Sequence, residues 1–323
     1  MAKETDRDDF IISIRSALLN KGTRQKFSLF TLLILSIIIL SSPAASQTLP
    51  ENFPKCFESD VDSSNYCPYE GKIGHKFILV DFTSRWHKAQ VDWIKGRIFG
   101  NVITISTPPF HKISYLKIDD NEPLSQEITY SKCRFKSGKK TKFKGDEVNK
   151  KCEGIGPIKD IFATWNSQLN EVEKSFFDSH TKEADNSFII EYIVSILNEP
   201  KFDFLNDYPE RELVIVSDLM QNSNRIDFYH FCRTPLDLNQ QPNKCKNLEK
   251  LLKNKKIKRY FETRKPENLD NLKVTIFFMN HSYQTKCNLE ESLESLWSEI
   301  FEYWGINNVK WNYETDNSQS CPS

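Results

Sequence analysis

Two aspartates, each at the end of an apolar run, are the residues of this sequence best placed to do chemistry. Asp81 ends the run Phe77–Val80 and is followed two residues later by the hydroxyl of Thr83. The run Leu213–Val216 is likewise followed by a hydroxyl and an acid, Ser217 and Asp218. Carboxylate and hydroxyl groups are hard oxygen ligands of the kind that Mg²⁺ prefers. The alternative interpretation is structural, with Asp81 opening a polar loop and capping the next helix.

Both apolar runs are continuous, and a run without alternation is typical of a central strand covered on both faces of a parallel sheet. In open α/β sheets, ligands bind outside the carboxyl ends of such strands. We therefore expect Asp81 and Asp218 to meet at one edge of a single sheet. The hydroxyls of Ser84 and Ser217 are expected to line the same place.

The order of the remaining elements predicts a doubly wound, mostly parallel α/β domain over residues 75–315. Strands are expected at 75–81, 102–106, 113–118, 213–216, 272–279 and 309–311. Helices are expected at 86–99, 157–177, 188–197, 246–259 and 288–304. The strand at 113–118 is assigned to a sheet edge, and the polar stretch 119–153 to a solvated hairpin. Ser187 is the expected N-cap of the helix that follows it.

The N-terminal part of the sequence predicts export. Residues 27–45 are apolar or small throughout, about the length of a membrane-spanning helix. Basic residues precede this segment and none follows until Lys55, which places the N-terminus in the cytoplasm. A cleavable signal is the alternative, because small residues at Ala44–Ser46 suit a cleavage site. The expected division is a cytoplasmic tail at 1–26, an anchor or signal at 27–45, a linker with a disulfide loop at 46–74 and a C-terminal tail at 316–323.

The cysteines agree with an exported body. All eight lie after the apolar segment, and an even number in such a context predicts four disulfides. Pairing between neighbours is the simplest hypothesis. It gives Cys56–Cys67, Cys133–Cys152, Cys232–Cys245 and Cys287–Cys321. A zinc site is disfavoured because no Cys-x-x-Cys occurs.

Charge excludes a strong electrostatic attraction to nucleic acid, because 44 basic residues balance 44 acidic ones. The basic segment 250–259 is interpreted as a solvated helix face, with contact to an acidic partner or anionic lipid as the alternative. The sequence contains no glycine-rich phosphate loop and no Gly-x-Ser-x-Gly elbow.

With this order of elements, the chain resembles the von Willebrand factor A (VWA) family. The resemblance lies in Asp-Phe-Thr-Ser-Arg at 81–85, in the segment Glu212–Asp218, and in the strand and helix at 272–305. It is closest to divergent, membrane-anchored bacterial members in which Val-Ser-Asp-Leu replaces the usual Thr-Asp-Gly. It implies a Rossmann-like sheet and a domain that binds another protein.

The family's metal-ion-dependent adhesion site takes Asp-x-Ser-x-Ser from one loop, Thr from a second and Asp from a third. Carried across, Asp81 and Thr83 match the first loop, Ser187 the second and Asp218 the third. Arg85 stands where the last hydroxyl should be, which removes one ligand. The resemblance therefore implies a degenerate Mg²⁺ site. Alternatively, Arg85 forms a salt bridge with one of the acids and no ion is bound.

Three functions follow from these residues. The first is a non-enzymatic binding module that recognises another protein of the envelope or cell surface. The second is a Mg²⁺-dependent hydrolase of the haloacid-dehalogenase type that uses Asp81, although Thr83 stands where such phosphatases usually have a second acid. The third is a metal-free structural subunit of an envelope complex. The expected location is a single-pass membrane protein whose main domain is periplasmic or extracellular.

Overall fold

A single mixed sheet of six strands organises the part of the chain that the structure describes. The computed structural model describes residues 67, 72–84, 86–101, 106–134, 155–178, 184–232, 245–279 and 287–313. The strands are β1 (Gly74–Asp81), β2 (Lys112–Ile118), β3 (Tyr130–Cys133), β4 (Glu210–Ser217), β5 (Leu272–Phe278) and β6 (Val309–Tyr313). Their order is β3-β2-β1-β4-β5-β6, and only β3 runs antiparallel to its neighbour. The predicted α/β fold with a mostly parallel sheet is confirmed.

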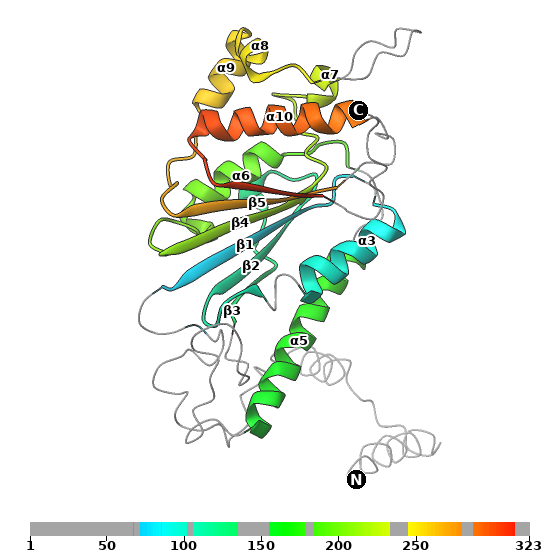
Figure 1. Ribbon diagram of the computed structural model, residues 1–323, viewed down its shortest axis with the longest axis vertical. Coiled ribbons are helices and arrows are strands. Elements are labelled where there is room, and N and C mark those ends of the chain that lie inside the picture. The colour runs from blue at the N-terminus through cyan, green and yellow to red at the C-terminus, as the bar shows by residue number, and fades with distance from the viewer. Residues whose placement is uncertain are drawn as a thin grey trace, which may run out of the picture. The chain divides into compact units, whose positions relative to one another are not determined.

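Helices cover both faces of this sheet, as Figure 1 shows. One face is covered by α3 (Lys88–Ile94), the π-helix that continues it (Lys95–Asn101) and α5 (Ile155–Asp178). The other face is covered by α6 (Ile189–Asn198) and α10 (Cys287–Trp304). The short helices α7 (Phe228–Cys232), α8 (Leu248–Leu252) and α9 (Lys255–Glu262) lie on the α10 side. Single 3-10 turns occupy Pro123–Ser125 and Pro200–Phe202.

The continuous apolar runs become the two central strands. All four side chains of Phe77–Val80 are fully buried. Alternate residues point to opposite faces. In β4, Leu213 and Ile215 therefore join the core beneath α6 and α10, whereas Val214 and Val216 join the core beneath α3 and α5. Burial on both faces explains why these strands lack the alternation of a half-exposed strand.

Two element predictions were wrong, and a third falls mostly outside the described residues. β2 lies inside the sheet, because residues 130–133 form an antiparallel strand beyond it rather than part of a solvated hairpin. The single helix expected at 246–259 is two helices, and Asn254 caps the second of them with its side chain. The strand expected at 102–106 falls outside the described residues except for Ser106, which is not part of a strand.

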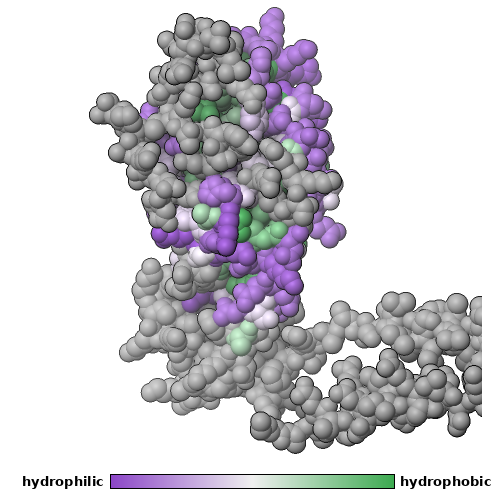
Figure 2. All heavy atoms as spheres, turned by 90° about the vertical axis from the view of Figure 1, so that its right-hand side faces the viewer, coloured by the Kyte–Doolittle hydropathy of each residue, from purple (hydrophilic) through white to green (hydrophobic). Residues whose placement is uncertain are grey.

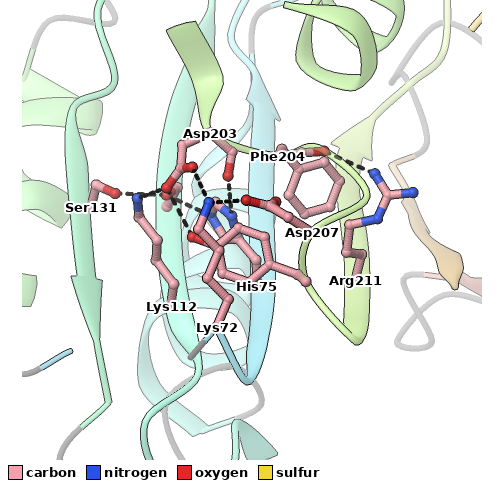
Figure 3. A network of polar contacts seen from close by, with 10 residues as sticks. Lys72, His75, Lys112, Ser131, Asp203, Phe204, Asp207 and Arg211 are labelled. Carbon is pink, nitrogen blue, oxygen red and sulfur yellow. Dashed lines mark hydrogen bonds and ion pairs between the residues drawn. The ribbon is translucent and has the colours of Figure 1, made fainter. Parts of the chain in front are cut away.

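A chain of hydrogen bonds ties the amino ends of the strands together, as Figure 3 shows. Burial lowers the pKa of His75 to about 3, so the ring is neutral. Its Nδ1 lies 2.9 Å from the carbonyl oxygen of Asp203, which can only accept, so Nδ1 carries the proton. Nε2 therefore accepts from Ser114 Oγ at 2.8 Å, and Ser114 Oγ accepts from Ser131 Oγ at 2.9 Å. The chain crosses β1, β2 and the start of the strand β3.

The Asp203 carboxylate gathers cations at the same place. It accepts from Lys72 at 2.9 Å, Lys112 at 2.6 Å and Tyr208 at 2.8 Å. Burial would raise the pKa of Asp203, but these hydrogen bonds hold it well below its ordinary value. Lys72 also contacts Asp207, so the segment that leads into β1 is fastened before the sheet begins.

The disulfides correct the neighbour-pairing hypothesis in part. Cys232–Cys245 is present as predicted. Cys67 bonds instead to Cys133, at the end of the edge strand β3, so the predicted pairs Cys56–Cys67 and Cys133–Cys152 are wrong. Cys56, Cys152 and Cys321 lie outside the described residues, and so does the predicted anchor at 27–45. Within the described ranges, no helix combines the length and apolarity needed to cross a bilayer.

The two disulfides should differ in their effect on stability. Cys67–Cys133 closes a loop across a sequence separation of 66, and Cys232–Cys245 across one of 13. Replacing both cysteines of the first pair by serine should lower the free energy of unfolding by about 4 kcal/mol, against about 3 kcal/mol for the second pair. Urea denaturation measures both values. Non-reducing peptide mapping that recovers a Cys56–Cys67 peptide would contradict the assignment.

Candidate functional site

Asp81 and Asp218 lie together at the carboxyl edge of the sheet. The parallel register of β1 and β4 sets Val80 opposite Val216, so Asp81 and Ser217 are the next residues on adjacent strands. The two carboxyls are 0% and 1% exposed. The strand order reverses between β1 and β4, because the chain builds outward from β1 to β3 and then from β4 to β6. Ligands of open α/β sheets bind at such a switch point.

Both oxygens of Asp81 accept hydrogen bonds from neighbouring hydroxyls. Thr83 donates to Oδ1 twice, through its backbone N–H at 2.9 Å and its Oγ1 at 2.6 Å. Ser217 Oγ donates to Oδ2 at 2.6 Å. The first two donors turn the chain sharply after β1, which is an Asx-type turn. Asp81 is therefore bonded within its own loop and across to β4.

Asp218 likewise accepts hydrogen bonds from both loops, the one after β1 and its own after β4. Its Oδ2 accepts from Ser84 Oγ, of the loop after β1, at 2.6 Å, and its Oδ1 accepts from the N–H of Met220 at 3.0 Å. Ser217 and Ser84 thus each cross between the two loops, one to each acid. The predicted lining residues Ser84 and Ser217 are in contact with the acids.

The two carboxyls repel one another. Burial and then the charge of Asp218 raise the pKa of Asp81 to about 7, although the hydrogen bonds from Ser217 and Thr83 oppose this shift. Two adjacent buried carboxylates are costly unless a proton or a cation neutralises one of the charges. Near neutral pH, the site therefore favours uptake of a positive species.

Ser187 lies beside the two acid loops, but it is not the N-cap of α6. Phe188 occupies the cap position without a side-chain hydrogen bond, so that prediction was wrong. The backbone of Ser187 pairs with Asn222 in both directions, at 2.6 and 2.9 Å, and Ala184 N donates to Thr83 O at 3.0 Å. Ser187 Oγ is buried and has no hydrogen-bond partner among the described residues. An orphaned buried hydroxyl in this place is an available ligand oxygen.

Arg85 lies outside the described residues. The predicted salt bridge between its guanidinium and Asp81 or Asp218 therefore stays a prediction. So does the loss of a ligand at its position.

Two further residues shape the site and gave no signal in the sequence. Leu219 has a left-handed backbone with φ of 59°, which is strained for a leucine. Its N–H donates to Ser217 Oγ at 2.7 Å, and its carbonyl oxygen accepts from Trp297 Nε1 at 2.9 Å. Gln221 takes over the capping role, since its Oε1 accepts from Ile190 N at 2.8 Å and its Nε2 donates to Glu191 at 2.9 Å. These contacts fix the loop that carries Asp218.

The donor set fits a hard divalent cation. Asp81 and Asp218 supply carboxylates, while Thr83 and Ser187 supply hydroxyl oxygens, the kind of set that Mg²⁺ accepts together with waters. No group of three or more His, Cys, Asp or Glu side chains that could hold a metal occurs among the described residues. An ion at this edge would therefore depend on hydroxyls as well as acids. Figure 2 looks onto this edge and shows hydrophobic side chains flanked by hydrophilic ones near its middle.

Comparison with known proteins adds little to this picture. No family model and no curated protein matches the chain. Among solved structures, it is similar to human COPII-coat protein Sec24c, with 9% identity, a TM-score of 0.31, and coverage of 76% of this chain and 30% of that one. It is also similar to the pilus adhesin SpaC from Lactobacillus rhamnosus GG in its open conformation (8%, 0.33, 77% and 28%) and to proximal thread matrix protein 1 of the mussel byssus (10%, 0.28, 73% and 49%). The chain spans less than half of each of these proteins, and likenesses at this TM-score carry no argument.

The buried acid pair predicts an unusual pH dependence of stability in the absence of metal. The pKa of Asp81 is raised from 3.8 to about 7 in the folded protein, so its contribution is present at low pH and is lost as pH rises through 7. In EDTA, the melting temperature should fall by several degrees between pH 5 and pH 8. Asp81→Asn should remove this fall, because the amide has no charge to repel Asp218. A wild-type profile that is flat across this range would contradict the prediction, and differential scanning calorimetry measures it.

Proposed function

We propose that the chain is an exported VWA-like binding module that recognises a carboxylate of a partner protein through a divalent cation at the carboxyl edge of β1 and β4. The observation that carries the proposal is the pair Asp81 and Asp218, buried side by side and held by hydroxyls at the strand-order switch point. Positive charge at this position relieves the repulsion between the acids. The same ion has room in its ligand shell for an oxygen from outside.

The proposed ligands are Asp81, Thr83, Ser187 and Asp218. When bound, the ion supplies a Lewis-acidic charge that attracts the partner's carboxylate. The hydroxyl protons of Thr83 and Ser217 can rotate away from Asp81, so that its oxygens become free for the ion. Ser187 Oγ needs no such change, because it has no hydrogen bond to give up among the described residues.

The strand order supports a VWA-type assignment. A parallel sheet with one antiparallel edge strand, ordered β3-β2-β1-β4-β5-β6, suits the resemblance carried by Asp-Phe-Thr-Ser-Arg at 81–85 and Val-Ser-Asp-Leu at 216–219. The described disulfides, Cys67–Cys133 and Cys232–Cys245, favour an oxidising compartment and hence export. The proposed location is periplasmic or extracellular, with residues 27–45 as the membrane anchor.

The phosphatase hypothesis fits the geometry less well. Phosphatases of this type usually carry a second acid two residues after the nucleophilic aspartate, where it can protonate the leaving group. Thr83 occupies the position of the second acid, and its hydroxyl donates to Asp81 rather than facing a leaving group. We therefore prefer binding to hydrolysis.

Isothermal titration of Mn²⁺ and Mg²⁺ into the oxidised protein tests the cation. Binding heat is expected for the wild type, weaker binding for Ser187→Ala, and none for Asp218→Ala. Glu302→Ala is the matched control, because this exposed acid lies near the end of α10, just before the start of β6 and at the opposite end of the sheet from Asp81. No heat in the wild type with either metal would remove the cation and leave the metal-free structural subunit.

Crosslinking to the native partner separates a cation-dependent contact from metal-free assembly. A crosslink that is lost in EDTA and in Asp218→Ala, and restored to the wild type by Mg²⁺, supports the proposal. A stable crosslink that is indifferent to EDTA would support assembly without an ion. Turnover of a generic phosphate ester that disappears in Asp81→Asn would support the phosphatase instead.

A further inference from the structure

The helices α8 and α9 form an outer layer over α10. Their apolar side chains face inward: Ile257 and Tyr260 are buried, and the ring of Phe261 lies 6.2 Å from that of Trp304 and 6.4 Å from that of Tyr303. Because one side of each helix packs on the domain, the other side faces outward. Figure 1 shows α8 and α9 beyond α10, on its side away from the sheet.

The outward side is strongly basic. Residues 246–265 contain nine basic side chains and two acidic ones, which gives a net charge of +7, whereas the remaining chain has 35 basic and 42 acidic residues. The basic residues are Lys246, Lys250, Lys253, Lys255, Lys256, Lys258, Arg259, Arg264 and Lys265, hereafter the basic surface. All of them are exposed except Arg264, which is half-buried and lies 4.5 Å from the ring of Tyr260.

The two acids in this segment do not remove its positive charge. Glu249 lies 3.7 Å from Lys253 and Glu262 lies 3.8 Å from Lys258, each one helical turn away. Such exposed pairs are weak and leave most of the positive field intact. The neutral total charge of the protein therefore conceals a local excess of positive charge at residues 246–265, and a field of this kind orients a molecule toward a polyanionic surface.

We propose that the basic surface binds an anionic lipid bilayer through electrostatic attraction alone. Seven of its nine basic residues are lysines. Protein interfaces are depleted of lysine and are anchored by aromatic residues and arginine. Between residues 246 and 265, no large hydrophobic side chain is exposed that could anchor a protein or insert into lipid. Anionic lipid headgroups are mobile, so they can gather around dispersed, flexible lysines without any fixed contact geometry.

The placement of the basic surface is compatible with the candidate site. From α9, the chain runs to the start of β5, at the edge of the sheet where β1 also begins. Asp81 ends β1 at the opposite edge. Contact with a bilayer through α8 and α9 therefore does not cover the end of the sheet where the acid pair lies. The proposal does not depend on the cation or on its partner.

Partition of the full chain between water and vesicles tests the proposal. The ratio of the partition coefficients for vesicles of one-third phosphatidylglycerol and for pure phosphatidylcholine is the measured quantity, because the apolar contribution of residues 27–45 is common to both. The triple variants below separate the basic surface from the basic residues that precede this segment. This ratio should be well above one at low salt and approach one in 0.5 M NaCl. A ratio near one at low salt would overturn the proposal.

A triple variant tests the residues. Lys250→Gln, Lys255→Gln and Lys256→Gln together should lower the ratio about 100-fold, since each lysine near an anionic surface contributes roughly a factor of five. The corresponding lysine-to-arginine variant should keep the ratio. A control with Lys88, Lys174 and Lys310 replaced by glutamine removes the same charge elsewhere and should change it little. Equal losses in both triple variants would show a general charge effect and overturn the proposal.

Hydrogen exchange locates the contact and distinguishes lipid from protein. Amides of 246–265 should exchange more slowly on phosphatidylglycerol vesicles and at an unchanged rate on phosphatidylcholine. Poly-glutamate serves as the probe for an acidic protein. Protection by poly-glutamate without protection by vesicles would overturn the lipid proposal in favour of an acidic partner.

Discussion

The burial of two carboxyl groups side by side is the constraint on which the rest of the site depends. Asp81 and Asp218 are held close together, because the register between β1 and β4 fixes Val80 opposite Val216, one residue before Asp81 and two before Asp218. Neither can reach water, since both are almost completely buried. Charged pairs in such an environment are stable only with compensation. Hydroxyl donors supply part of it, and the remaining repulsion appears as the raised pKa of Asp81.

The loops around the acids are shaped by that compensation. Each acid is bonded both to its own loop and to a serine of the other one, so hydrogen bonds tie the two loops to each other. The left-handed Leu219 donates its N–H to the hydroxyl of Ser217, and the indole of Trp297, from α10, donates to the carbonyl oxygen of the same residue. A strained residue that is overdetermined by its surroundings is common at functional sites. Here the left-handed Leu219 is held through both of its backbone polar groups, in the loop that carries Asp218.

The sequence was informative wherever local pattern decides structure. Phe77–Val80 and Leu213–Val216 were predicted as buried strands, because a short unbroken apolar run that ends in polar residues is typical of a strand covered on both faces, and parallel pairing then brought Asp81 and Asp218 together. It was uninformative wherever a distant contact decides. Cys67 pairs with Cys133 because β3 adds antiparallel to β2, and no local feature of residues 130–133 announces that strand.

Ser187 illustrates the same limit at the scale of one side chain. A serine before an apolar helix is a good N-cap by propensity. In the folded chain, however, Gln221 comes from a loop more than thirty residues away and takes the free N–H of Ile190. The serine hydroxyl is thereby displaced from capping and left without a partner among the described residues. Capping alone does not explain the presence of Gln221, because Ser187 already offered a hydroxyl for that role.

Aspartate pKa values are shifted in opposite directions at the amino ends and at the carboxyl ends of the strands. At the amino edge, Asp203 is surrounded by Lys72, Lys112 and Tyr208, so its charge is satisfied within the chain and its pKa is held down. At the carboxyl edge, Asp81 has hydroxyl donors and a second acid, and its pKa rises. Asp203 is paired with lysines of the chain, as is usual for an acid with a structural role. Hydroxyl donors stabilise the carboxylate of Asp81 without neutralising its charge. Such an arrangement is expected where a cation from outside the chain is to bind.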